Sequence, residues 1–453
     1  MKMKKGLRKI FPRWVFDLRH FFIASRAARQ YRHPSRELFV IGVTGTSGKS
    51  TTVDFIRQML IQAGFRAGSL STVDFHIGGM AEINSYKMTM IGGDFIQRKL
   101  REMVEAGVEV AVVETSSEGI LQYRHRFVEY DMVILTNLYP EHIEAHGGFA
   151  NYKKAKMKLF AHTAGLFRKP TTGKLQRFVS LFGERIDKIG IVGASDHAAD
   201  FLQYDLDLKK IFGEKNNLAD IKNTDEQIIY SDVSVTATGL DFSLNGEKCH
   251  ASLLGEHNVH NITAAALALS SLRVPMEKIR NYISHLHGVP GRLEKISEAD
   301  VHGFQVIVDY AFEPIAVAAL YRSISTVPHQ RIIHVCGSTG GGRDVARREP
   351  LGRLIGDMAD VVFVTNEDPY DDDPQLIIDD VARGVLKSGK QINKDVFKIT
   401  DRREAIEKAL KMAEPNDLVL ITGKGSEQGM CIEGGKIVPW DDRMAVREIL
   451  ESI

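Results

Sequence analysis

The residues with the clearest chemical potential lie in FVIGVTGTSGKSTTVDF, residues 39–55. An apolar run ends at TGTSGK and a segment with helical spacing follows, so the turn joins a strand to a helix start. Backbone N–H groups at such a position bind phosphate, a lysine adds a cation, and a serine hydroxyl reaches Mg²⁺. The usual phosphate-loop template places a glycine where Val43 stands, and an ordinary strand–turn–helix connection is the alternative. We nevertheless predict nucleotide binding by Gly45, Thr46, Ser47, Gly48, Lys49, Ser50 and Thr51.

Further candidate groups follow other expected strands. Glu114 ends VEVAVVE and His142 follows DMVILTN; ligands sit at the carboxyl ends of strands in open α/β sheets. A carboxylate and an imidazole there suit metal binding or acid–base chemistry, although each residue type is also common as a structural group. Lys156 is one of four lysines in NYKKAKMKLF. Such a charge-rich helix is usually a solvated face, so composition alone assigns Lys156 no chemistry.

The C-terminal part contains three more glycine-rich or acidic turns. CGSTGGGRD (336–344) follows a strand and ends in an arginine that suits an anion, with a flexible linker as the alternative. EDPYDDDPQ (367–375) either caps the helix after it or favours a cationic ligand. TGKGSEQG (422–429) repeats the arrangement of a strand followed by glycines.

The elements that must position these residues alternate between β-rich runs and helical stretches from residue 37 onward. This alternation predicts an α/β fold, with a phosphate-loop central domain on a mostly parallel sheet and a C-terminal Rossmann-like domain. Residues 227–256 indicate antiparallel hairpins, and Gly and Pro interrupt the pattern near 287–296. We therefore expect a basic amphipathic segment at 1–36, a nucleotide-binding domain at 37–293 and a C-terminal α/β domain at 294–453. The main expected strands are 38–43, 108–114, 131–137, 304–310, 331–337, 360–366 and 417–423, and the helices include 49–63, 94–106, 149–161 and 258–272.

Composition excludes several classes of protein. The 453 residues are 43% hydrophobic and 26% charged, which is typical of a globular chain with a large core. No apolar run is long enough to span a bilayer. The three cysteines are dispersed, which argues against a disulfide framework or zinc site and favours a reducing cytoplasm.

Charge is distributed unevenly along the chain. Residues 1–36 carry eleven Lys or Arg against one acidic residue, a net charge of +10 compared with +1 for the whole chain, so the remainder sums to −9. The segment also contains WVFDLRHFFI. A basic, aromatic-rich helix of this kind lies on an anionic membrane surface, and a helix packed on the protein body is the alternative. The acidic remainder, without a reader motif, argues against nucleic acid as a partner.

Taken in order, the motifs resemble those of the Mur ligase family, the ATP-dependent ligases that extend peptidoglycan stem peptides. The similarity runs from about residue 38 to the C-terminus, and it most resembles the tripeptide-forming members. The matching stretches are GVTGTSGKSTT, ETSSEG, TNLYPEHIEAHG, NYKKAKMKLF, GEHNVHN, VPGRLE, VDYAFEP, GGGRD, EDPYDDDP and GKGSEQ.

The resemblance implies a reaction and its site. ATP would phosphorylate a muramoyl-peptide carboxylate, and the amino group of the added amino acid would then displace the phosphate. A diamino acid is the favoured added residue. The implied catalytic residues are Lys49, Glu114, His142 and Lys156, with two Mg²⁺ ions held by Ser50, Glu114, His142 and a carbamylated Lys156. Nucleotide contacts beyond the loop are implied at Asn258, Asn261, Arg292, Asp309 and Tyr310. Substrate contacts are implied at Thr89, Thr115, Ser116, Arg124, Asn137, Arg343, Asp368, Pro369, Gly423 and Glu427.

The same resemblance implies a monomeric enzyme of peptidoglycan biosynthesis, acting in cell wall biogenesis, cell shape and division. It would work in the cytoplasm, with residues 1–36 as a peripheral contact to the inner membrane face.

Two features depart from the family pattern. Only about 40 residues precede the phosphate loop, where three-domain members carry a uridine-nucleotide-binding domain. The motif that selects diaminopimelate ends in arginine, whereas this chain has Asp368-Pro369-Tyr370 followed by three aspartates, which favours a cationic amino acid such as lysine unless Arg343 compensates.

Two other functions remain open from the sequence. A folylpolyglutamate-type or cyanophycin-type ligase of the same superfamily would use the same acyl phosphate chemistry. A nucleotide-binding membrane adaptor without catalysis belongs to another class, although it would not need Lys49, Glu114, His142 and Lys156 together.

Overall fold

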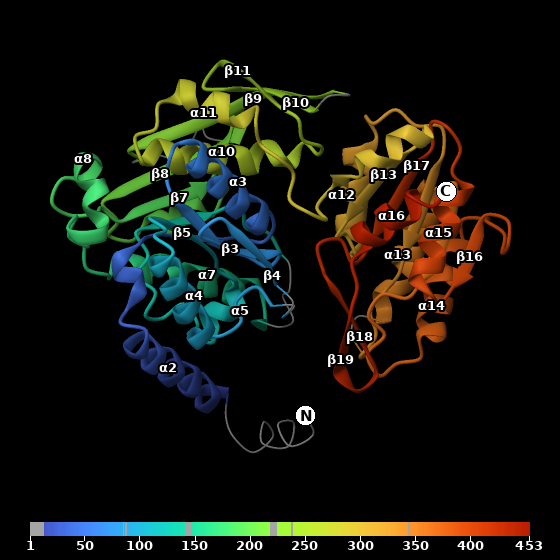
Figure 1. Ribbon diagram of the computed structural model, residues 1–453, viewed down its shortest axis with the longest axis horizontal. Coiled ribbons are helices and arrows are strands. Elements are labelled where there is room, and N and C mark those ends of the chain that lie inside the picture. Colours follow the sequence, from blue (N-terminus) through green and yellow to red (C-terminus); the bar gives the residue numbers. More distant parts are fainter. Residues whose placement is uncertain are drawn as a thin grey trace. The chain divides into compact units, whose positions relative to one another are not determined.

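The computed structural model describes residues 13–84, 86, 88–140, 146–217, 224–236, 239–342 and 345–453. The chain forms two compact units (Figure 1). The first comprises residues up to 234, 240–252 and 256–287, and the second comprises 235–239, 253–255 and 288–453.

The first unit is built on an eleven-stranded sheet. The strand order is β11-β10-β9-β8-β7-β6-β1-β5-β2-β3-β4. The strands from β9 to β2 are parallel, and β3, β4 and the β10–β11 hairpin run antiparallel at the edges. Central strands such as β1 are buried on both faces, which explains their nearly continuous apolar sequences. The strands are β1 (Phe39–Thr44), β2 (Ala67–Leu70), β3 (Asp74–Ile77), β4 (Met80–Ile83), β5 (Val110–Glu114), β6 (Met132–Leu135), β7 (Ile189–Gly193), β8 (Leu208–Glu214), β9 (Glu226–Thr236), β10 (Gly239–Leu244) and β11 (Glu247–Ala251).

Helices cover both faces of this sheet (Figure 1). The contiguous core on one face joins α4, α7 and α9 to inward-facing residues such as Val40, Val113 and Val133. The helices α3 and α10 pack against each other and against the sheet. The helices are α3 (Lys49–Gln62), α4 (Gly93–Glu105), α5 (Ser117–Leu121), α7 (Phe149–Ala164), α8 (Val179–Phe182), α9 (Ala198–Leu202), α10 (His257–Ser271) and α11 (Met276–Ile283), with short 3₁₀ turns at Pro34–Glu37, Gly173–Phe178 and Lys215–Asn217.

The N-terminal segment forms α2 (Arg13–Gln30), which packs against α4. Ala24, Ala27 and Ala28 are buried, and a Cβ atom on Gly93 would lie 2.6 Å from the Cβ of Ala24. The ring of Phe21 lies 5.2 Å from that of Phe127 on the body. Phe21 therefore packs on the protein body, as the alternative prediction for this segment has it, because small alanines let the helix approach α4 closely. Residues 1–12 lie outside the described residues.

The second unit has a six-stranded sheet in the order β12-β13-β17-β14-β15-β16, parallel except for β12. One apolar core lies between this sheet and α12, α13 and α14, and another lies between the opposite face and α15 and α16. The strands are β12 (Glu294–Lys295), β13 (Gln305–Asp309), β14 (Ile332–Cys336), β15 (Val361–Thr365), β16 (Val396–Ile399) and β17 (Leu418–Thr422), with a separate hairpin β18 (Gly429–Ile432) and β19 (Lys436–Pro439). The helices are α12 (Pro314–Ile324), α13 (Val345–Met358), α14 (Pro374–Leu386), α15 (Arg402–Met412) and α16 (Asp442–Leu450), with 3₁₀ turns at Ser297–His302 and Glu433–Gly435.

The predicted α/β class, with two mostly parallel sheets, is confirmed. The three cysteines are free and buried. No helix within the described ranges has the length and apolar character needed to cross a bilayer.

Candidate active site

The turn between β1 and α3 holds Gly48 in the left-handed region, with φ +73°. A Cβ atom there would lie 2.2 Å from Oδ1 of Asn261, so both backbone conformation and space require glycine. The turn leads directly into α3, whose first residue is Lys49. The backbone N–H groups of a first helical turn have no partner within the helix, which leaves those of Lys49, Ser50 and Thr51 able to bind an anion.

Residues behind the turn fix its shape. The side-chain oxygen of Asn137 accepts hydrogen bonds from the backbone N–H of Thr46 at 3.2 Å and of Ser47 at 2.9 Å. The Thr136 hydroxyl donates to the Ser47 carbonyl at 2.7 Å. Asn137 was predicted to contact substrate, and here its amide supports the loop.

Glu114 lies at the end of β5, beside the start of α3. Its Oε2 atom accepts hydrogen bonds from the Ser50 hydroxyl at 2.9 Å, the backbone N–H of Thr72 at 2.7 Å and the Thr72 hydroxyl at 2.9 Å. The Thr72 and Thr89 hydroxyl oxygens are 2.9 Å apart. Glu114 and Thr89 also line a small, mostly apolar pocket with Leu70 and other residues. The structure thus brings together Ser50, Glu114 and Thr89 from three separate segments of the chain.

Lys156 lies on α7 and is only 1% exposed, so the reading of its helix face as solvated is wrong at this position. Its Nζ atom donates to the Gly45 carbonyl at 2.6 Å and lies 4.4 Å from the centroid of the Tyr152 ring. Tyr152 in turn donates from its hydroxyl to Thr46 Oγ1 at 3.2 Å. Lys49 Nζ donates to the Thr46 carbonyl at 2.9 Å. Two lysines therefore contact the same loop, while His142 lies outside the described residues.

Two of the residues predicted to contact the nucleotide lie beneath the loop. Asn261 and Asn258 are buried on α10, with 3.1 Å between Nδ2 of Asn261 and Oδ1 of Asn258. The Thr52 hydroxyl donates to Oδ1 of Asn261 at 3.4 Å. This pair connects α10 to the first turn of α3.

Three predicted substrate contacts have partners within the protein. Thr115 is fully buried and its hydroxyl donates to the Val113 carbonyl at 3.2 Å. Ser116 caps α5 by accepting from the backbone N–H of Gly119 at 3.2 Å. Arg124 donates to the Met90 carbonyl, and burial lowers the pKa of its guanidinium from the ordinary value.

In the second unit, four predicted residues meet in one network, and Asp309 bonds to the backbone beside two of them. The Arg292 guanidinium lies 4.3 Å from the centroid of the Tyr310 ring, and the Tyr310 hydroxyl donates to Glu427 at 3.1 Å. The Asp309 carboxylate accepts from the backbone N–H groups of Leu293 and Ala311, each at 2.7 Å. Burial raises the pKa of the Tyr310 hydroxyl above its ordinary value. Asp368 joins this network through Lys424, whose Nζ atom lies 3.0 Å from Asp368 and 2.6 Å from Glu427.

The remaining predicted residues of this unit lie around the same loops. Gly423 has φ +103°, and a Cβ atom there would lie 2.4 Å from Oε2 of Glu367. The carbonyl of Pro369 approaches Gly340, where a Cβ atom would lie only 2.1 Å away. Arg343 lies outside the described residues.

Comparisons with known proteins identify the family. Residues 43–166 match the Mur ligase middle domain, and residues 291–425 match the Mur ligase glutamate ligase domain. A UDP-N-acetylmuramyl-tripeptide synthetase of Roseiflexus sp. (strain RS-1) is 34% identical over 439 residues, which is 95% of this chain and 82% of that protein. The chain belongs to the Mur ligase family.

Solved structures of Mur ligases share the fold. A UDP-N-acetylmuramoyl-L-alanyl-D-glutamate–2,6-diaminopimelate ligase is 25% identical with a TM-score of 0.60, over 92% of this chain and 78% of that one. A folylpolyglutamate synthase from Mycobacterium tuberculosis, solved with ADP and AMPPCP, has a TM-score of 0.66 over 95% of both chains at 16% identity. At 16% identity, the similarity to the folylpolyglutamate synthase shows a shared fold and nothing more.

The Mur ligase chain also has site residues that sequence reasoning missed. Lys424 is fully buried between the carboxylates of Asp368 and Glu427. Like Lys49, it stands in a glycine-rich turn after a strand, and this sequence pattern could have indicated it as a site residue. Glu367 is 3% exposed, and no described residue bonds to its Oε2 atom. Burial raises the pKa of Glu367 to about 7, against the opposing charges of Lys424 and Arg402. Nothing in the sequence signals this buried acid, because its burial depends on the approach of Gly423.

Proposed function

We propose that this Mur ligase is an ATP-dependent, ADP-forming amide ligase that adds an amino acid to a muramoyl-peptide precursor. The names of its relatives support the substrate class. The observation that carries the proposal is the gathering of Lys49, Glu114 and Lys156 around one glycine-rich turn. Such a site needs a cation for phosphate, a carboxylate for a metal and a second titratable group, which a purely structural turn does not need.

In this proposal the turn binds the ATP phosphates. The backbone N–H groups at the start of α3 and the Lys49 ammonium hold the phosphate oxygens. The γ-phosphoryl group passes to the substrate carboxylate, with ADP as the leaving group. The amine of the incoming amino acid then attacks the acyl carbon, phosphate leaves, and the amine loses its proton as the amide forms.

Ser50 and Glu114 fit Mg²⁺, which binds proteins through one or two carboxylates, hydroxyls and substrate phosphates. The observation behind this fit is a buried carboxylate already in contact with a serine hydroxyl at 2.9 Å. Among the described residues no three His, Cys, Asp or Glu groups form a cluster that could hold a metal ion. When bound, Mg²⁺ would offset the charge that develops on the phosphoryl oxygens. His142 and a second ion stay part of the proposal.

We propose carbamylation of Lys156, because its buried amine contacts the loop carbonyl of Gly45 at 2.6 Å. A carbamate there would replace a positive charge with a negative one beside the metal-binding groups. Incubation with ¹³C-bicarbonate should give a carbamate NMR signal that Lys156→Arg abolishes. Lys158→Arg is the matched control, because Lys158 is exposed on the same helix. A signal that persists in Lys156→Arg would contradict the assignment.

We propose that the added amino acid has a cationic side chain. The acidic residues Asp368, Asp371, Asp372 and Asp373 support this, because they stand where the motif that selects diaminopimelate ends in an arginine. We propose lysine-type diamino acids over diaminopimelate, whose distal carboxylate would meet this negative charge.

Phosphate release tests the function directly. Purified protein with Mg²⁺-ATP should release phosphate only when a muramoyl dipeptide and an amino acid are both present. The acceptor should be offered in nucleotide-linked and lipid-linked forms, with lysine and diaminopimelate as donors and pteroylglutamate as the acceptor of the rival ligase class. Turnover with pteroylglutamate alone would replace the proposal with that class, and no turnover with any acceptor would favour a non-catalytic nucleotide binder. We further propose a monomer working in the cytoplasm, which sedimentation and fractionation would test.

A further inference from the structure

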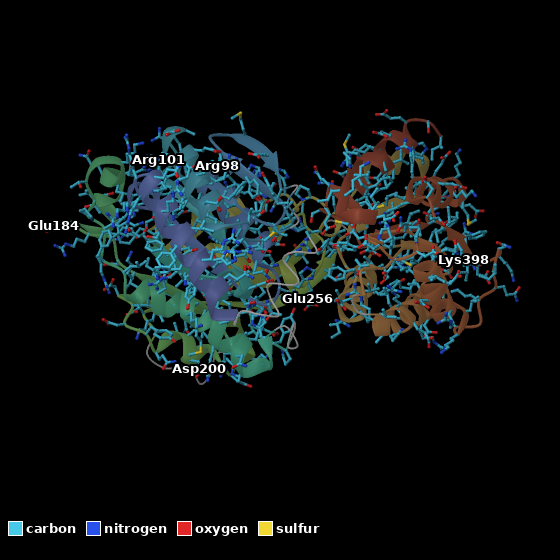
Figure 2. The ribbon with its side chains drawn as sticks, turned by 90° about the horizontal axis from the view of Figure 1, so that it is seen from below. Arg98, Arg101, Glu184, Asp200, Glu256 and Lys398 are labelled. Atoms are coloured by element: carbon cyan, nitrogen blue, oxygen red, sulfur yellow. The ribbon has the colours of Figure 1, made fainter. Side chains whose placement is uncertain are left out.

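The outward face of α2 carries three arginines around an exposed phenylalanine. Arg19, Arg26 and Arg29 are exposed, and Phe22 is 66% exposed. Their spacing of three, four and three residues places them on one stripe of the helix. Figure 2 shows α2 lying across the outer surface of the first unit. Among the side chains that the structure describes, which on α2 begin at Arg19, no carboxylate forms an ion pair with any of the three arginines, so their charge is available to a partner.

The packing of α2 fixes which way this stripe faces. The opposite side of the helix is buried through Ala24, Ala27 and Ala28. Its C-terminal end is held by Arg101 of α4, which lies beside it in Figure 2 and donates to the carbonyl of Tyr31 at 3.0 Å. The helix cannot turn its arginines inward without breaking this packing. The stripe is thus a fixed surface feature.

We propose that this stripe docks the protein on the surface of an anionic phospholipid bilayer. Phe22 would enter the headgroup zone, and Arg19, Arg26 and Arg29 would lie on lipid phosphates. Arg36 is not part of the contact, because it already pairs with Glu129 at 2.8 Å. The inference goes beyond the ligase reaction and does not depend on it.

Charge favours a bilayer over a nucleic acid as the occupant. The chain outside residues 1–36 sums to −9, so a polyanion that extended beyond α2 would meet repulsion. A flat anionic surface needs only the one basic face. An exposed aromatic ring between arginines also gains by entering a headgroup layer, whereas base stacking uses several rings on one platform.

Vesicle sedimentation tests the proposal with the full chain. Phosphatidylcholine vesicles with phosphatidylglycerol should bind the protein, and vesicles of phosphatidylcholine alone should not. Replacing all three arginines (R19Q, R26Q, R29Q) should weaken binding about five-fold per residue, on the order of 100-fold together. Added salt should weaken wild-type binding more than that of the variant. Phe22→Ser should weaken binding while leaving its salt dependence unchanged.

The matched control removes the same charge elsewhere. Lys248, Lys278 and Arg322 are exposed on other elements, and K248Q, K278Q and R322Q together should bind like wild type. Equal loss in both triple variants would reduce the effect to net charge and overturn the proposal. Unchanged binding after the α2 substitutions, equal binding to neutral vesicles, or binding to an RNA oligonucleotide but not to vesicles would also overturn it. Circular dichroism verifies that each variant is folded.

Discussion

Replacing Glu114 with glutamine should separate the fold of the site from its metal chemistry. The Oε2 atom of Glu114 accepts three hydrogen bonds, from Ser50 Oγ, Thr72 N and Thr72 Oγ1. Glutamine keeps an acceptor oxygen of similar size but removes the negative charge. We expect Glu114→Gln to fold and to lose the Mg²⁺-dependent part of ATP binding.

The structure sets the size of the effect. Glu114→Ala would deprive the buried Ser50 hydroxyl and the half-buried N–H and hydroxyl of Thr72 of this acceptor, at about 1–3 kcal/mol each, for a destabilisation of about 3 kcal/mol or more. Glutamine weakens these bonds by roughly 1 kcal/mol each, and removing a buried charge offsets part of that loss. The free protein should therefore lose clearly less stability in Glu114→Gln than in Glu114→Ala. A ligand at 100 times its Kd stabilises the folded state by about 2.7 kcal/mol, and the part of this gain that depends on Mg²⁺ should vanish in Glu114→Gln.

Calorimetric titration with ATP, in Mg²⁺ and in EDTA, measures the affinity, and thermal unfolding with the same ligands measures the stabilisation. Thr72→Val is the matched control, because it removes one donor to the same oxygen while keeping the charge, and it should retain the Mg²⁺ dependence. If Glu114→Gln binds ATP with the wild-type Mg²⁺ dependence, Glu114 is not the metal ligand.

Three further predictions concern the loop and the second unit. Gly48→Ala should weaken ATP affinity, because φ +73° costs about 1–2 kcal/mol for alanine and the methyl group would displace Asn261; Gly64→Ala, at φ +80° with its nearest neighbour 3.9 Å away, isolates the strain alone in the same titration. Glu367, with its pKa raised by burial to about 7 from 4.5, binds its proton more tightly when folded, so stability should fall as pH rises from about 4.5 to 7. Between pH 4 and pH 8 this one group should cost the wild type on the order of 3 kcal/mol of unfolding free energy. Glu367→Gln should lack this loss, as measured by thermal unfolding at the two pH values. Arg402→Met should cost about 3–5 kcal/mol, because it leaves the fully buried Asp442 without its 2.7 Å partner; Arg403→Met, which breaks an exposed pair, should cost less than about 1 kcal/mol.

The central elements could be predicted because their sequences are locally consistent. LFVIGV, VEVAVVE and DMVILTN are apolar and bounded by polar turns, and the structure forms strands within a residue or two of each. The glycine-rich turn was predictable for the same reason, since its residue types have few other uses. Capping of α14 was one of two interpretations of the acidic stretch before it, and Asp373 does cap the helix by accepting from the backbone N–H of Gln375 at 2.9 Å.

Sequence reasoning failed where tertiary contacts decide burial. Strand β8 begins LKKIF, and two consecutive lysines are not typical of an inner strand. Lys210 is nevertheless buried there beside Glu226. Lys169 and Lys188 are both fully buried against Asp131, at 2.5 and 2.9 Å. Burial lowers the pKa of Lys169 to about 8, although Asp131 opposes the shift. No local pattern reveals that three charged residues from distant segments share one interior position.

The structure explains why Val43 stands where the usual phosphate-loop template has a glycine. The usual phosphate loop turns at that glycine, but here β1 continues to Thr44 and Val43 is fully buried within it. Val43 is paired in register with Glu114 on β5, so the longer strand brings the Glu114 backbone level with the end of β1. The turn then starts at Gly45, whose carbonyl meets Lys156. Val43→Gly should therefore restore the template while damaging the site: a buried valine removed from a strand costs stability and loosens the strand that aligns Glu114 with Ser50. Stronger Mg²⁺-ATP binding in Val43→Gly, measured by the same titration, would refute this account of the loop.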